Sequence, residues 1–243
     1  MNTRFSTYTF LHMLLGAVSI SYPCTTALAD AQLATQLQDS LSHSSDVSIL
    51  THAHEHINYT SCLPCHGDAA QGKQSVFAPS LAGQARWYLE RQISNYQDGL
   101  RGMHARDVYG ASMRAMSLLL LDEAVRNNVL DEIEAFPAPQ AVQLDNQQYD
   151  LESGKERYTI SCARCHGDYA EGNEAEGAPR LNALPAWYTV RQLRNFQAGI
   201  RGQHDDDTLG QEMRPMAMAV YNEHDIHNVA AYIATLQASE PKK

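Results

Sequence analysis

Residues 61–68 read SCLPCHGD and residues 161–168 read SCARCHGD, so one short motif occurs twice with an offset of 100 residues. Each copy holds two cysteines separated by two residues and followed directly by a histidine. These residues are Cys62, Cys65 and His66 in the first copy and Cys162, Cys165 and His166 in the second. Because the second motif keeps the spacing of the first, the chain can be compared with itself at an offset of 100 residues.

The repeat extends well beyond the two motifs, at the same offset and without a gap. Repeated positions include Trp87, Tyr88, Arg91, Gln92, Gly102, Met113 and Met116, each with an identical residue 100 positions later. Self-similarity over this length indicates a duplicated structural unit. Between the copies, residues 137–148 are rich in proline and glutamine and lack a periodic apolar pattern, which predicts a linker. We therefore expect one domain at residues 54–136, a linker at 137–150 and a second domain at 151–243.

Both copies are predicted to be helical. Apolar residues recur at helical spacing in residues 122–135 and 223–237, and residues 86–98 and 186–198 form another matched pair. No run alternates with the period of a strand over a useful length. The sequence predicts an all-α fold with a helix before the cysteine pair, a middle helix and a closing helix in each copy.

The C-x-x-C-H motif is the attachment signature of c-type haem. Two thiols at this spacing lie on one side of a helical turn, where each can add to one vinyl group of the porphyrin, and the next residue carries an imidazole to the iron. Four cysteines are also compatible with two disulfides, redox dithiols or a zinc site. None of these needs a histidine after both pairs, so the sequence predicts two covalently attached haem c groups per chain.

The other axial position of an electron-transfer haem is usually filled by methionine or by a second histidine. The candidates that occur in both copies are Met113, Met116, Met213, Met216, His104 and His204. The two histidines lie in glycine-flanked, polar sequence typical of an exposed loop. We favour methionine on both irons, which raises the reduction potential relative to two histidines, and expect one methionine of each pair to pack in the core.

The N-terminal sequence has the pattern of an export signal, with Arg4, an apolar stretch at residues 10–20 and the small residues Ala27 and Ala29. The apolar stretch is about half the length that spans a bilayer, although an uncleaved anchor is the alternative. We predict a cleaved signal peptide at residues 1–29, and hence a periplasmic protein. Residues 30–53 are expected to form an N-terminal arm, either a short amphipathic helix or a loose segment.

The charge balance excludes one class of partner and suits another. Asp and Glu number 28 against 18 Lys and Arg, giving a net charge of −10. Sequence-independent binding to nucleic acid needs many basic residues, so no nucleic-acid partner is expected. An acidic surface suits encounter with basic protein partners. The cluster His52, His54 and His56 is a compositional hint of metal binding, but alternating histidines in polar sequence are more often solvated.

From about residue 54 onward the chain resembles the cytochrome c4 family of dihaem cytochromes. The resemblance lies in the two CHGD boxes, the segment APSLAGQ at residues 78–84, the two W-Y-x-x-x-Q segments and the two M-R-x-M segments. It implies two tandem class-I cytochrome c domains, each a few helices wrapped around one covalently bound haem, with the haem edges facing. It also implies a periplasmic or membrane-associated electron carrier that often feeds terminal oxidases.

The resemblance assigns roles to particular residues. In the family, the first methionine of the M-x-x-M segment is the iron ligand. This implies Met113 and Met213 as ligands here, with Met116 and Met216 as second choices. The proline after each motif, Pro79 and Pro179, is expected to accept the N–H of the proximal histidine and so to fix its tautomer. Arginine suits carboxylates, so Arg101 and Arg201, and with them Arg114 and Arg214, are candidates for contacts with haem propionates. Their alternative role is surface charge.

The sequence therefore predicts an electron carrier that transfers single electrons between a respiratory donor and an acceptor such as a terminal oxidase. These partners are expected to be membrane respiratory complexes, and peripheral membrane association stays open. An electron-transfer subunit of a larger oxidoreductase is an alternative that shares every site residue. A peroxidase-like or thiosulfate-oxidising dihaem enzyme generally needs an open iron or an unusual ligand such as cysteine. Catalysis would favour different roles for the two haems, whereas the two copies are nearly identical around their motifs.

Overall fold

The computed structural model describes residues 57–139 and 148–236. The predicted signal peptide (residues 1–29), the N-terminal arm (residues 30–53) and the cluster His52, His54 and His56 lie outside these residues. Most of the predicted linker does so as well. Within the described ranges, no helix combines the length and the apolar character that crossing a membrane would need.

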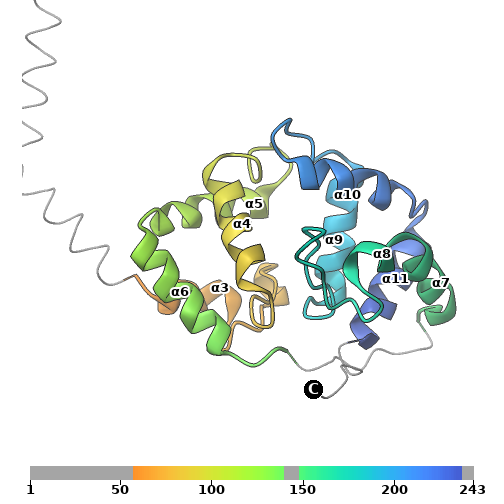
Figure 1. Cartoon of the computed structure of the whole chain (residues 1–243), viewed down its shortest axis with the longest axis horizontal. Helices are drawn as coiled ribbons and strands as arrows, with labels where there is room; N and C mark the ends of the chain where they lie inside the picture. The colour runs from red at the N-terminus through yellow and green to blue at the C-terminus, as the bar shows by residue number, and fades with distance from the viewer. Residues whose placement is uncertain (1–56, 140–147, 237–243) are drawn as a thin grey trace, which may run out of the picture. The chain divides into compact units, whose positions relative to one another are not determined.

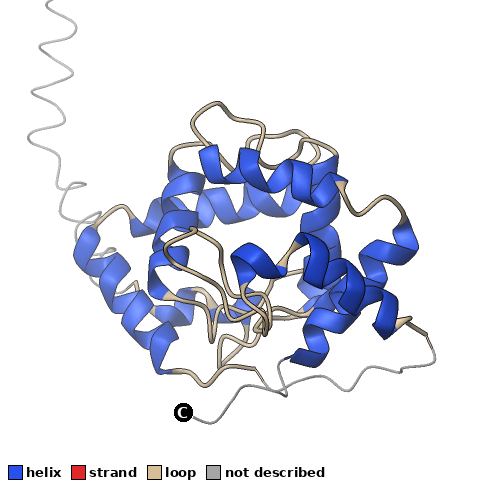
Figure 2. Ribbon diagram, turned by 45° about the vertical axis from the view of Figure 1, so that its right-hand side comes forward, coloured by secondary structure: helices blue, strands red, loops and turns tan. Residues whose placement is uncertain are grey.

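The described residues form helices joined by loops, and no strand occurs in them (Figure 2). Their only ladder pairings are two isolated antiparallel bridges, Lys73 with Ala78 and Asn173 with Ala178. These bridges stand at equivalent positions of the two copies, each closing a loop that follows the Cys-x-x-Cys-His motif. The predicted all-α fold is confirmed.

Four α-helices follow in the same order in the two copies, whereas the 3-10 helices η2 and η3 occur only in the first (Figure 1). The first contains η1 (Tyr59–Ser61), α3 (Leu63–His66), η2 (Gln74–Val76), α4 (Arg86–Gln97), α5 (Val108–Ser117), η3 (Leu118–Leu120) and α6 (Glu123–Ala135). The second contains α7 (Leu151–Ser161), α8 (Ala163–His166), α9 (Ala186–Gln197), α10 (Thr208–Met218) and α11 (Glu223–Thr235). The four helices expected from apolar periodicity, α4, α6, α9 and α11, are confirmed.

Helices α5 and α10, which carry the M-R-x-M segments, were not expected from apolar periodicity. Each begins after an aspartate, Asp107 or Asp207, whose carboxylate accepts the N–H of Gly110 at 2.9 Å or of Gly210 at 3.0 Å. A side chain that satisfies a free N–H of the first turn is a strong signal for the start of a helix. The sequence therefore did contain evidence for these helices, in their caps rather than in their apolar pattern.

The segment before the cysteine pair differs between the copies. In the second copy it is the α-helix α7, as expected, whereas in the described part of the first copy it is only the short 3-10 helix η1. Helix α7 packs closely on α11 at Gly154, where an added Cβ would lie 2.2 Å from the carbonyl oxygen of Asn228. Glycine therefore permits this approach, which a larger residue would prevent.

Each copy has a hydrophobic core of its own. In the first, Leu89 and Ile93 of α4 pack with Val129, Leu130 and Ile133 of α6. The second core is built from equivalent helices, and Tyr158 of α7 takes the place that Tyr59 of η1 has in the first core. Members of the second core include Tyr158, Leu193, Phe196, Val229 and Ile233. Burial of apolar surface drives the folding of each copy, and both cores lie against the segments that carry the cysteines.

Candidate functional site

The two cysteines and the histidine of each motif lie on a single helical turn. The backbone N–H of His66 donates to the carbonyl of Cys62 at 2.9 Å, and that of His166 donates to the carbonyl of Cys162 at 3.0 Å. All four cysteines in the described residues have free thiols. The turn therefore presents two thiols and one imidazole at the spacing that the motif predicted.

The environment of the first thiol of each pair is unlike that of a redox dithiol. Burial raises the pKa of Cys62 to about 11 and that of Cys162 to about 12. Reactive thiols of Cys-x-x-Cys oxidoreductases have the opposite property, a lowered pKa that generates thiolate near neutral pH. These thiols are therefore not activated as exchange nucleophiles, which favours attachment over dithiol chemistry.

Both motif histidines are buried and held through one ring nitrogen. Nδ1–H of His66 donates to the carbonyl of Pro79 at 2.8 Å, and Nδ1–H of His166 donates to that of Pro179 at the same distance. Burial lowers the pKa of both histidines, although the bond to the proline carbonyl opposes this effect. The neutral imidazole with its proton on Nδ1 leaves the lone pair of Nε2 available to a metal.

A loop stabilised by glycine brings each proline to its histidine. The N–H of Gly72 donates to the carbonyl of His66 at 2.7 Å. Gly72 has φ +82°, and a Cβ there would lie 2.6 Å from the carbonyl carbon of Pro79. Gly172 has φ +87° and a similar close approach in the second copy. Glycine is needed for both the left-handed backbone and the contact.

Two tyrosines that the sequence analysis did not single out also hold these motifs. The hydroxyl of Tyr59 donates to the carbonyl of Gly67, and that of Tyr158 donates to the carbonyl of Gly167, each at 2.5 Å. Both rings are almost fully buried. The two tyrosines are offset by 99 residues rather than 100, so matching the copies at fixed register did not pair them.

In the second copy, the predicted site residues meet around one cavity. Its lining includes Cys162, Cys165, His166, Met213 and Met216. Met213 is half-buried and packs against the core, whereas Met216 is 44% exposed. The first copy shows the same contrast, with Met113 half-buried and Met116 38% exposed. Burial therefore favours the first methionine of each pair as the one directed inward.

The two loop histidines take part in local turns. Nδ1 of His104 accepts the N–H of Arg106 at 3.1 Å, and Nδ1 of His204 accepts the N–H of Asp206 at 3.2 Å. His204 is exposed, and His104 is half-buried beside exposed neighbours. His204 does not line the cavity that contains Cys162 and Cys165, whereas Met213 does, which agrees with the preference for methionine.

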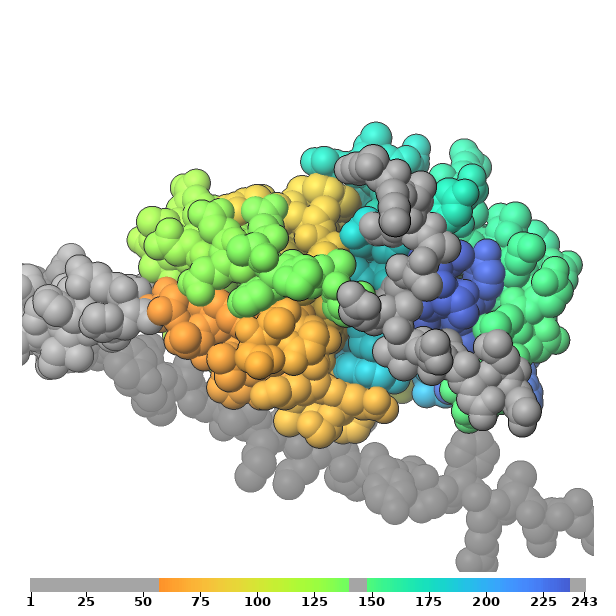
Figure 3. Space-filling view, turned by 90° about the horizontal axis from the view of Figure 1, so that it is seen from below, coloured from red at the N-terminus to blue at the C-terminus, as the bar shows by residue number. Residues whose placement is uncertain are grey.

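Arg101 and Arg201 lie where the two copies meet, within the compact unit formed by residues 51–243. Nη2 of Arg101 donates to the hydroxyl of Tyr188 at 2.9 Å, and Nη2 of Arg201 donates to that of Tyr88 at 3.4 Å. Figure 3 shows atoms of the first copy, orange to green, against atoms of the second, teal to blue. Each arginine therefore bridges to the other copy. Arg201 also lines the cavity that contains the cysteines of the second copy.

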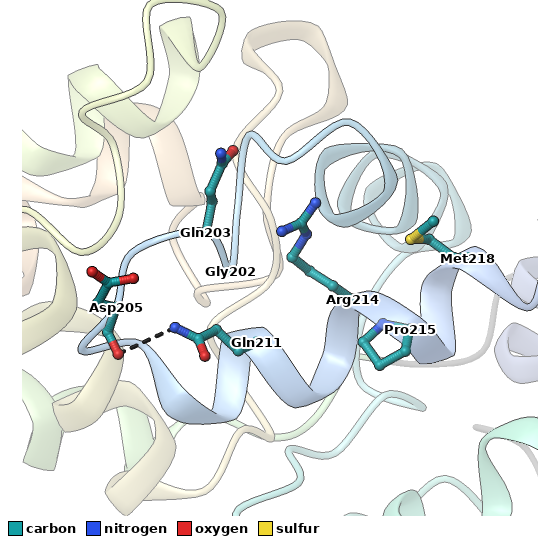
Figure 4. Close-up of a pocket in the computed structure, with 7 residues that line it drawn as sticks. All are labelled: Gly202, Gln203, Asp205, Gln211, Arg214, Pro215 and Met218. Carbon is teal, nitrogen blue, oxygen red and sulfur yellow. Dashed lines mark hydrogen bonds between the residues drawn. The ribbon is translucent and has the colours of Figure 1, made fainter.

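Arg214 lies elsewhere, in a separate open hollow between loop residues 202–205 and α10 (Figure 4). There Gln211 donates to the carbonyl of Asp205 at 3.1 Å, and the lining includes Pro215 and Met218. Nε of Arg214 donates to the carbonyl of Phe196 at 3.4 Å. The hollow contains no thiol or imidazole, so its chemistry differs from that of the cysteine cavity.

The donor set in each copy fits a covalently attached haem. Two unpaired thiols on one turn match the two vinyl groups, a buried imidazole offers Nε2 to iron, and a half-buried thioether lies on the helix bearing M-R-x-M. In the second copy these groups line one cavity whose remaining walls are largely apolar, including Leu181, Leu193 and Phe196. An apolar cavity with few polar groups is the usual form of a cofactor site.

Comparison with known proteins agrees with this donor set. Residues 151–237 match the family model described as cytochrome c. A protein of Stutzerimonas stutzeri (strain A1501) named thiosulfate dehydrogenase electron acceptor is 27% identical over 188 residues, covering 74% of this chain and 81% of that protein. Cytochrome c4 of Azotobacter vinelandii is 27% identical over 184 residues, covering 72% of this chain and 84% of its own length.

A solved structure of cytochrome c4 from Acidithiobacillus ferrooxidans has the same fold. It superposes with a TM-score of 0.58 and 24% sequence identity, covering 73% of this chain and 99% of that one. Because nearly all of that chain is covered, the likeness includes both copies and not only the second.

Proposed function

On the premise that the chain is a cytochrome c4-like member of the cytochrome c family, we propose that it is a periplasmic electron carrier with one haem attached to each copy. Covalently bound haem c is a property of the family, and relatives named cytochrome c4 support electron transfer as the general role. We further propose that the chain carries two haems, that it lies in the periplasm and that it has no enzymatic activity of its own.

The observation that carries the proposal is the repetition of one complete donor set. Cys62 and Cys65 attach the first haem and Cys162 and Cys165 attach the second. His66 and His166 ligate the irons through Nε2, because Nδ1 of each is held by a proline carbonyl at 2.8 Å. The haem supplies an iron that cycles between ferric and ferrous states.

Met113 and Met213 are proposed as the second axial ligands. Each is half-buried, while the methionine three residues later is more exposed. The neutral sulfur of a thioether ligand favours the ferrous state. Met116 and Met216 remain second choices, since Met216 also lines the cavity.

With a histidine and a methionine on each iron, both axial positions would be filled, as a carrier rather than an enzyme requires. Catalysis at a haem needs an open or exchangeable position, and the two copies supply the same ligands with no difference in donor type. Electrons are proposed to pass between a donor and an acceptor that are redox proteins of the respiratory chain. We propose that these partners are membrane complexes, to which this chain binds either from solution or while attached to the membrane surface.

One relative supports a second candidate for the donor. The Stutzerimonas stutzeri protein is named as the electron acceptor of a thiosulfate dehydrogenase. By analogy, the chain is proposed to accept electrons from a dehydrogenase rather than from a membrane complex. The same haem ligands serve both candidates, so only the donor distinguishes them.

The test is the optical spectrum of the purified mature protein in its oxidised and reduced states, with haem quantified and carbon monoxide added. The carrier proposal expects two haems per chain, a methionine-to-ferric-iron charge-transfer band and no response to carbon monoxide. A high-spin signal, or a carbon monoxide shift at one haem, would refute it. Reduction by thiosulfate alone would indicate an enzyme, whereas reduction only with an added thiosulfate dehydrogenase would favour the second donor.

A further inference from the structure

Four arginines occupy the contact between the copies, and all of their hydrogen bonds go to neutral groups. Nη2 of Arg91 donates to the carbonyl of Gly177 at 2.7 Å, and Nη2 of Arg191 donates to that of Phe77 at 2.8 Å. Arg101 and Arg201 donate to tyrosine hydroxyls and glutamine carbonyls. Their partners are Tyr88, Tyr188, Gln92 and Gln192. Each arginine therefore contacts the opposite copy.

None of the ion pairs found in the described residues includes any of these four arginines. Arg101 is only 8% exposed, the others are half-buried, and Nη1 of Arg191 is buried without a hydrogen-bond partner. Burying positive charge is costly unless an opposite charge compensates it. The four guanidinium groups lie over aromatic rings instead, and no ion pair in the described residues neutralises them.

Three carboxylates line the same cavity, but none forms an ion pair with these arginines. Asp207 interacts electrostatically with Arg91 and also caps α10 through the N–H of Gly210, while Glu176 and Glu212 are exposed. Burial lowers the pKa of Arg91 and of Arg191, and in each case a neighbouring arginine of the opposite copy lowers it further. The charges thus repel one another across the contact.

The cavity of the second copy connects these arginines to the attachment residues. Its lining includes Arg91 and Gln92 of the first copy together with Arg201, Cys162 and His166 of the second. A group attached at Cys162 and Cys165 therefore shares one cavity with a guanidinium from the other half of the chain. A haem carries two propionates, so a haem attached at Cys162 and Cys165 would bring carboxylates into a cavity that Arg91 and Arg201 line.

We propose that Arg91 of the first copy is part of the haem site of the second copy, where its guanidinium pairs with a haem carboxylate, and that Arg191 does the same in reverse. This inference rests on the proposed attachment of one haem to each copy. Arg91 acts from α4, and its bond to Gly177 places it on the loop that carries Pro179 to His166. The arginine therefore contacts the site through both the loop and the cavity.

The arrangement makes each haem sensitive to a residue of the opposite copy. Positive charge near an iron stabilises the electron that arrives there, so removal of that charge lowers the reduction potential. Arg91→Gln should lower the potential of the second-copy haem more than that of the first-copy haem. Arg191→Gln should lower the other one.

The experiment is a redox titration of the haem-loaded full chain as wild type, Arg91→Gln, Arg191→Gln and Arg91→Lys, together with a crystal structure of the wild type. We expect the two glutamine variants to lower different redox waves. Arg91→Lys should keep most of the wild-type potential, because it keeps the charge. In the crystal structure, Arg91 should lie within hydrogen-bond distance of a carboxylate of the haem attached to Cys162 and Cys165.

Arg86→Gln is the matched control, because Arg86 lies on the same helix but pairs at the surface with Glu90, Asp131 and Glu134. It should leave both potentials unchanged. Equal lowering of both waves by one variant, no lowering by either, or a crystal structure with Arg91 away from that haem would overturn the inference. If the wild type itself lacks two low-spin haems, the proposed function fails instead. The wild-type crystal structure decides the case even if a glutamine variant does not fold.

Discussion

The two copies reach the same donor geometry through different secondary structure. In the first copy, Tyr59 stands in the 3-10 helix η1, whereas in the second Tyr158 stands in the α-helix α7. Both hydroxyls nevertheless donate to the carbonyl of the glycine after the motif histidine, at 2.5 Å. The duplicated chain has therefore kept the bond while the element that supplies it, and its register, have changed.

The contact between the copies is less symmetric than the two sites. Phe77 and Gly177 are equivalent and both have a left-handed backbone, with φ 58° and 61°. The ring of Phe77 packs on that of Tyr109, with 4.8 Å between the ring centroids. Gly177 has no side chain, and a Cβ added there would lie 3.0 Å from Nη1 of Arg91. The donor sets are thus alike while their surroundings differ. If each copy holds one haem as proposed, we expect any difference between the two to arise from the contact rather than from the ligands.

The largest expected effect is loss of one haem at a time. Cys62→Ser with Cys65→Ser should leave one haem per chain, and Cys162→Ser with Cys165→Ser should leave the other, because serine cannot form the thioether. The protein is denatured and extracted with acidified organic solvent, which removes haem that is not covalently bound. The haem that stays with the protein is then quantified. Retention of two covalent haems by either variant would contradict the assignment.

The next effect is on the reduction potential of one haem. Met113→His and Met213→His should each lower a single wave by hundreds of millivolts, within the range of about 0.8 V that axial ligands can span. A redox titration checks this. Met116→His and Met216→His are the matched controls and should leave the charge-transfer band intact; loss of the band only in these controls would transfer the ligand role to the second methionine.

The contact itself should respond unequally to its two central arginines. Arg101→Gln should lower the free energy of unfolding by about 3 kcal/mol, because it removes three hydrogen bonds of a charged donor and leaves a buried tyrosine hydroxyl without its partner. Arg201→Gln should cost less, about 2 kcal/mol: Arg201 also makes three hydrogen bonds, but it is half-buried and its bond to Tyr88 is longer, at 3.4 Å. Denaturant unfolding measures both, and equal losses would show that the contact is symmetric in energy.

The smallest effect on stability is expected at Tyr59 and Tyr158, the two equivalent tyrosines that are offset by 99 residues rather than 100. Tyr59→Phe and Tyr158→Phe should each lower stability by about 1 kcal/mol, through loss of one buried hydrogen bond while the ring remains. Thermal unfolding of the haem-loaded protein checks this. Tyr169→Phe is a suitable control because that ring is 47% exposed. If Tyr59→Phe had no effect while Tyr158→Phe did, the bond would be structural only where an α-helix supplies the tyrosine.

Much of the fold and of the donor set was predictable from local pattern. The helices α4, α6, α9 and α11 follow from apolar periodicity, which reports one buried face. The cysteines and histidines follow from a motif whose spacing is set by covalent chemistry on one helical turn. Helices α5 and α10 were missed, since their partly exposed methionines and valine give a weak periodic pattern and their aspartate caps were not used.

The sequence by itself determined that the chain is duplicated, that each copy is helical, and that each carries two thiols and an imidazole in one turn, because these properties depend on residues close together in the chain. Only the tertiary structure decided which distant groups complete the site. It placed Tyr59 and Tyr158 in equivalent roles and set Arg91 against Gly177 of the other copy, whereas the bond from His66 to Pro79 was already implied by the family resemblance. The tyrosine bonds depend on how each copy folds around its motif, the arginine bond depends on the packing of one copy on the other, and no local periodicity records either.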